Sequence, residues 1–132
     1  MPTYGPWLAL VLVAVMAAGC SAKGTVPPMD DQGRYVIRMT DALRFEPAEA
    51  RVPSGATVVW VNAGQEAHDV AAYVGDPPSE DYPRFFSPKL HEPQYSVDAG
   101  MSYNATLNED GAWTIWCHRH HESDMRGVVH VG

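Results

Sequence analysis

Two short runs of β-type sequence are joined by the stretch Trp116-Cys117-His118-Arg119-His120-His121-Glu122-Ser123-Asp124-Met125-Arg126-Gly127. The runs on either side, residues 112–117 and 127–131, consist mostly of β-branched and aromatic residues, which favour strands. Asp110-Gly111, directly before the first run, is a strong signal for a β-hairpin. The stretch therefore predicts a loop between two strands, and this loop is rich in possible metal ligands.

Short apolar runs alternate with turn residues along the rest of the chain. Residues 34–39 alternate between apolar and polar side chains, and residues 57–62 (TVVWVN) are rich in β-branched residues. Residues 45–53 contain prolines, which cannot donate to a sheet ladder, and predict one irregular edge segment. Residues 75–93 contain five prolines and predict a long surface loop. The pattern predicts an all-β fold, an antiparallel Greek-key β-sandwich or barrel of seven to eight strands.

The N-terminal stretch has the composition of an export signal. Residues 1–19 carry no charged side chain, and their apolar run is shorter than the ~20 residues that a membrane-spanning helix needs. Ala17-Ala18-Gly19-Cys20 resembles the lipobox of bacterial lipoproteins, which implies that Cys20 is acylated and becomes the first residue. A plain signal peptide and an uncleaved anchor are the alternatives. We expect a signal peptide over residues 1–19, the lipid-bearing cysteine and a flexible tether over residues 20–33, and one domain over residues 34–132.

The chain length, the net charge and the number of cysteines restrict what kind of protein this is. The 132 residues suffice for one domain, and the net charge of −7 argues against a nucleic-acid partner. A negative net charge can keep a protein soluble or attract a basic partner, and the charge alone does not show which of these applies. Export would place the domain in an oxidising compartment, where cysteines normally form disulfides. With Cys20 lipidated, Cys117 has no partner, and metal binding is the best explanation for its free thiol.

Cys117, His120 and Met125 follow the spacing C-x₂-H-x₄-M. A thiolate and an imidazole together favour copper, zinc or iron, and two histidines, one cysteine and a weak axial methionine form the set that copper uses for electron transfer. Structural zinc sites usually have four firm nitrogen or sulfur ligands. The second histidine must come from elsewhere in the chain. His68 meets this requirement because it begins a predicted strand directly after a turn.

Three further segments resemble the cupredoxins, in particular the small blue copper proteins of the plastocyanin, halocyanin and pseudoazurin type. They are residues 52–62 (VPSGATVVWVN), 67–70 (AHDV) and 125–131 (MRGVVHV). The resemblance covers residues 35–131, nearly the whole predicted domain. C-x₂-H-x₄-M alone is moderately specific, but its combination with the W-x-N stretch and the following histidine is strong.

This resemblance implies a cupredoxin-like fold with one type 1 copper ion per chain. It makes His68 and His120 the imidazole ligands, Cys117 the thiolate ligand and Met125 the axial ligand. It also implies that electrons pass through the partly exposed edge of His120, where redox donors and acceptors dock transiently. We therefore expect a monomeric carrier of single electrons rather than an enzyme, held by Cys20 on the extracytoplasmic side of a bacterial membrane. A protein that binds or delivers copper without passing electrons is the alternative.

Two carboxylates depart from the family pattern. Asp69 follows His68 where the family often has asparagine, and Asp124 precedes Met125 where glycine is common. Negative charge near the metal stabilises Cu(II) over Cu(I). We therefore expect a lower reduction potential than in relatives with asparagine and glycine at these positions.

Four other histidines need an interpretation. His121 offers the alternative spacing C-x₃-H-x₃-M, although the spacing of His120 fits the family better. His118 points away from the metal if the strand alternation continues past Cys117. His118 and His121 are then exposed imidazoles near the point where electrons enter, and His91 and His130 are surface residues.

Overall fold

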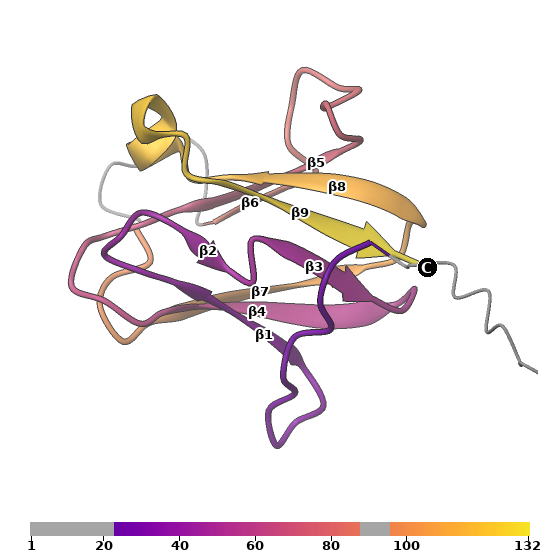
Figure 1. The fold of residues 1–132 in the computed structure, drawn as a ribbon, viewed down its shortest axis with the longest axis horizontal. Coiled ribbons are helices and arrows are strands. Elements are labelled where there is room, and N and C mark those ends of the chain that lie inside the picture. The colour runs from indigo at the N-terminus through magenta and orange to yellow at the C-terminus, as the bar shows by residue number, and fades with distance from the viewer. Residues whose placement is uncertain (1–22, 88–95) are drawn as a thin grey trace, which may run out of the picture.

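The computed structural model describes residues 23–87 and 96–132 and contains nine strands in that part of the chain (Figure 1). They are β1 (Tyr35–Met39), β2 (Phe45–Glu46), β3 (Glu49–Val52), β4 (Ala56–Asn62), β5 (Val70–Val74), β6 (Phe85–Ser87), β7 (Ser102–Leu107), β8 (Gly111–Trp116) and β9 (Arg126–Val131). One 3₁₀ helix, η1 (His118–Ser123), lies between β8 and β9. The predicted all-β sandwich is confirmed. No helix among the described residues is long and apolar enough to cross a membrane.

The strands form two packed sheets with the orders β2-β1-β4-β7 and β3-β9-β8-β5-β6. Both sheets are mixed, since β1 pairs with β4 and β3 pairs with β9 in parallel, so the predicted antiparallel arrangement does not hold for these two pairs. The segment 45–53, predicted as one irregular piece, divides into β2 and β3, which belong to different sheets. Pro47 lies between them, where the chain leaves one ladder for the other and no N–H is needed.

The proline-rich segment 75–93 is not a loop throughout. Phe85–Ser87 forms β6, which pairs with the outer edge of β5. The side chain of Phe85 also stacks on Trp113, with 5.7 Å between the ring centroids. An open strand edge and an aromatic contact thus override the local turn composition. Residues 88–95 lie outside the described part of the chain.

The described residues before residue 34 are hydrogen-bonded to the sandwich. Thr25 donates from its N–H to the carbonyl of Glu49 (2.9 Å) and accepts from the N–H of Arg51 (2.9 Å). The carbonyl of Pro28 accepts a hydrogen bond from β1 (2.8 Å). The segment therefore joins the edges of both sheets, because unpaired edge strands offer free backbone groups. Residues 25–28, which belong to the predicted tether, are therefore in contact with the sandwich.

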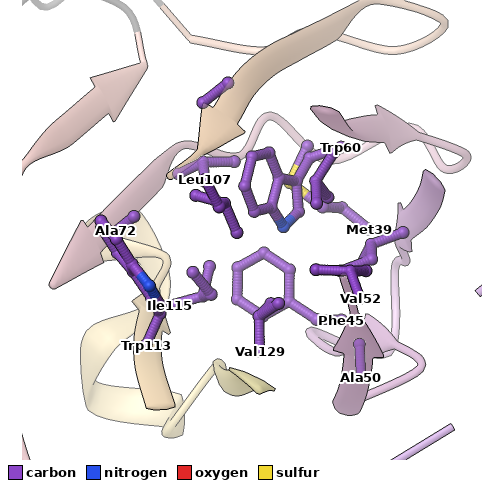
Figure 2. Packing of buried hydrophobic residues seen from close by; sticks show 14 of the residues in the cluster. Met39, Phe45, Ala50, Val52, Trp60, Ala72, Leu107, Trp113, Ile115 and Val129 are labelled. Carbon is purple, nitrogen blue, oxygen red and sulfur yellow. The ribbon is translucent and has the colours of Figure 1, made fainter. Parts of the chain in front are cut away.

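The core lies between the two sheets and contains large side chains from both. Trp60 and Phe45 occupy its centre, with Leu107, Ile115 and Val129 around them (Figure 2). The core anchors the strands whose ends carry the loop of η1. That loop lies at the end of the sandwich away from the C-terminus (Figure 1).

Candidate metal centre

Three side chains with metal-binding atoms converge at one end of the sandwich. The Nδ1 atoms of His68 and His120 are 3.2 Å apart, and the Sγ atom of Cys117 lies 3.9 Å and 3.4 Å from them, respectively. All three atoms fall within 4.8 Å of one another. Cys117 directly follows β8 and His68 precedes β5, and these two strands are antiparallel neighbours. Strand pairing therefore brings together residues that are far apart in the sequence.

The geometry and chemistry of this cluster fit a metal ion. The point equidistant from the three atoms is about 2 Å from each, the usual length of a bond from nitrogen to a metal ion and slightly short for sulfur. Burial, together with the neighbouring His120, lowers the pKa of His68, so its imidazole stays neutral and can accept a metal. Burial raises the pKa of the Cys117 thiol. A bound cation reverses this effect because a coordinating thiol loses its proton.

Met125 is fully buried and belongs to the same loop. Its carbonyl accepts a hydrogen bond from the N–H of Cys117 (3.0 Å), and its own N–H donates to the carbonyl of His120 (3.3 Å). The backbone of Met125 is thus tied to two members of the cluster. A soft thioether beside a thiolate and two imidazoles completes the donor set that copper prefers and zinc does not.

The structure brings His120, rather than His121, to the cluster. Within η1, His120 has non-helical backbone angles (φ −123°, ψ 30°), which form a kink. The ring of His121 instead lies 4.8 Å from the ring of Trp116. His118 also points away from the cluster, and its Nε2 atom lies 2.9 Å from the hydroxyl of Tyr73. The alternation of side chains along β8 thus continues past Cys117, and His118 points away from the cluster as expected.

Asp69 links the two chain segments that carry the cluster. Its backbone N–H donates to Sγ of Cys117 (3.5 Å), and its carboxylate accepts a hydrogen bond from the N–H of His118 (2.6 Å). An asparagine could also accept this bond, so the link needs an oxygen but no negative charge. Asp69 is buried, whereas Asp124 is exposed and has left-handed backbone angles (φ 54°). A left-handed position favours glycine, because glycine has no Cβ to oppose it.

Sequence reasoning missed the structural role of Asn62. Its side-chain amide donates to the carbonyls of Glu66 (2.6 Å) and Val97 (2.8 Å), and its Oδ1 accepts from the N–H of Gly64 (3.0 Å). The side chain thereby fixes the turn that leads to His68. An asparagine at the end of a strand, followed by a glycine two residues later, is the signal that could have revealed it.

The described part of the chain contains one further histidine. His130 is on β9, and its Nε2 atom is 2.9 Å from the carboxylate of Glu49. Cys20 and His91 lie outside the described residues, so their predicted roles stay predictions. The predicted signal peptide, residues 1–19, also falls outside.

Comparison with known families gives one match over most of the chain. Residues 32–132 match the family described as "Copper binding proteins, plastocyanin/azurin family". Plastocyanin A/B of Petroselinum crispum is 27% identical over 89 residues, which are 67% of this chain and 88% of that protein. The family match covers all four residues of the candidate centre.

Solved structures have a similar fold. The reduced Cu(I) form of an amicyanin mutant is 25% identical, with a TM-score of 0.58 over 76% of this chain and 83% of that one. A purple cupredoxin from Nitrosopumilus maritimus is 19% identical, also with a TM-score of 0.58, over 74% of this chain and 98% of that one. At this low identity, the match to the purple cupredoxin shows a similar fold and nothing more.

Proposed function

The chain belongs to the plastocyanin/azurin family of copper-binding proteins, and on that premise we propose that it carries single electrons at a copper site held by His68, Cys117, His120 and Met125. Copper is its cofactor, and the site is of type 1. The observation that supports this assignment best is the convergence of two Nδ1 atoms and one thiol sulfur around a point about 2 Å from each.

The protein contributes a fixed and dry environment. Bound copper supplies one-electron chemistry by cycling between Cu(I) and Cu(II). His68 and Cys117 are fully buried and lie beside paired strands, so neither can move far when the charge of the site changes. Met125 is also buried and keeps water away. Small rearrangement between the two oxidation states favours fast electron transfer.

His120 is the place where electrons enter and leave. Of the four proposed ligands, only His120 is half-buried, whereas the other three are fully buried. A redox partner that docks over His120 therefore approaches the metal more closely than it could elsewhere. Such docking is transient and needs only a small contact surface.

Copper loading tests the proposal. Adding Cu(II) to the purified metal-free protein is expected to give an intense visible band from thiolate-to-copper charge transfer, which saturates at one copper per chain. A one-electron reductant should bleach the band, and an oxidant should restore it. A protein that stays colourless under oxidising conditions with copper bound would contradict the assignment.

A protein that stores or delivers copper would behave differently. A delivery protein must release its metal readily, whereas a buried site with two histidines and one cysteine should not. The rate at which a chelator removes copper therefore separates the two functions. The one group of three possible histidine, cysteine and carboxylate ligands found among the described residues is the proposed copper site itself.

The location follows from the N-terminal sequence. Cys20, at the end of an uncharged apolar stretch and within a lipobox-like sequence, supports acylation and attachment to the extracytoplasmic face of a bacterial membrane. Attachment would confine the carrier to the plane in which membrane-associated donors and acceptors diffuse.

Replacement of the proposed lipid attachment residue tests this location. In a bacterial host, we expect the unchanged protein to sediment with membranes and to carry acyl chains, as measured by mass spectrometry. Cys20→Ser should carry no acyl chain, because no other residue offers a thiol there. An unchanged protein that sediments with membranes but carries no acyl chain would argue for an uncleaved anchor.

A further inference from the structure

The outer face of the sheet β3-β9-β8-β5-β6 carries a row of side chains beside η1. Strand pairing aligns Arg126 with Trp116, Trp116 with Ala71, and Ala71 with Phe86. Residues next to Trp116 and Ala71 along their strands belong to the core, so these two side chains point to the opposite face. We call Trp116, Ala71, Phe86 and the neighbouring Tyr73 the outer row.

Two histidines of the metal-binding loop rest on the outer row. The rings of His118 and Phe86 form a T-shaped contact, with 5.1 Å between centroids and 68° between planes. Its Nε2 atom also lies 2.9 Å from the hydroxyl of Tyr73. The His121 ring lies over Trp116 at 4.8 Å and 35°. Both imidazoles are therefore packed on the sheet although much of their surface is exposed.

The two contacts flank the kink in η1. The backbone departs from helical angles at His120 alone within this element. His120 turns toward Cys117 and His68, while His118 and His121 reach the outer row. The position of the His120 ring thus depends on the chain on both sides staying in place.

We propose that His118 and His121 are positioning residues, which hold the two sides of the kink on the outer row and so set His120 in place before the metal binds. The inference rests on the proposed function only because it takes His120 as a ligand. Neither imidazole needs to contact copper in this role. Each ring contact with an aromatic neighbour changes a local opening equilibrium by a factor of roughly 2 to 10.

Hydrogen exchange of the metal-free protein tests the proposal. The N–H of His120 is bonded to the carbonyl of Cys117 (3.2 Å), and the N–H of Met125 to the carbonyl of His120 (3.3 Å). We expect His118→Ala and His121→Ala each to speed exchange of these two amides roughly 2- to 10-fold. Amides of Trp60 and Val129, in the core, should exchange at the original rate.

Matched variants separate the ring contact from other effects. His118→Phe and His121→Phe keep a flat ring on the outer row and should restore most of the protection. Trp116→Ala should have little further effect once His121 is alanine, because the two residues act through one contact. His130→Ala serves as a control, since His130 lies on the same sheet but pairs with Glu49.

Copper loading supplies the second measurement. In the loaded protein, the alanine variants should release copper to a chelator faster by a similar factor, and their Cu(II) EPR hyperfine lines should broaden as His120 takes several positions. Unchanged exchange at His120 and Met125 in the double alanine variant would overturn the proposal. Faster exchange throughout the core would also overturn it, because the histidines would then act on global stability. A failure of the copper site itself would leave the metal-free result unaffected.

Discussion

Cys117→Ala is expected to abolish the intense visible band of the copper-loaded protein. The band requires a thiolate bound to Cu(II), and Cys117 is the only cysteine of the described chain. Its sulfur lies 3.4 Å and 3.9 Å from the two imidazole nitrogens, and the thioether of Met125 cannot replace it because a thioether carries no negative charge. Loss of a residue that only hydrogen-bonds to a metal ligand lowers metal affinity ~10- to 100-fold. Cys117 would bind the copper directly, so we expect its loss to lower copper affinity by more than that.

The second cysteine of the chain provides the matched control. Cys20→Ser removes a thiol outside the predicted domain and should leave the band unchanged. Thermal unfolding of metal-free Cys117→Ala shows whether the sandwich persists, since the variant removes one small buried sulfur. A Cys117→Ala protein that is folded and still coloured would exclude the thiolate assignment.

The metal-binding loop was predictable because three of the four proposed ligands lie close together in the sequence. The spacing of Cys117, His120 and Met125 places them in one loop, and turn residues before His68 mark the start of the strand that follows. Antiparallel pairing of β5 with β8 then brings the two parts together. Sequence spacing and one strand alignment were sufficient for this part.

Other features depend on contacts that local sequence does not encode. The parallel pairing of β1 with β4 joins segments whose order in the sheet no turn determines. Residues 24–30 have the composition of a tether, but an open sheet edge supplies partners for their backbone. The kink at His120 sends its ring to the cluster while the ring of His121 packs on Trp116, and the spacing alone does not encode these two packing contacts.

Asp69→Asn is expected to raise the reduction potential by on the order of 100 mV, because a unit charge a few ångströms beyond the ligands contributes about 2 kcal/mol at an effective dielectric constant of about 20. The Asp69 side chain is buried, so water and salt screen its charge only weakly. A carboxylate favours the more positive Cu(II) state, and its removal therefore favours Cu(I). Cyclic voltammetry of the two loaded proteins at the same pH measures the shift.

Asparagine at position 69 keeps the oxygen that accepts the hydrogen bond from His118, so the substitution changes charge while the link between the two segments remains. Asp124→Gly is the matched comparison, since it removes an equal charge from an exposed position with left-handed backbone angles. Solvent screens that charge, and we expect a clearly smaller shift in potential together with unchanged or slightly higher stability. Equal shifts for the two variants would mean that burial does not determine the effect. No shift for Asp69→Asn would mean that its charge does not tune the copper, and the role of Asp69 would then be confined to its hydrogen bonds with Cys117 and His118.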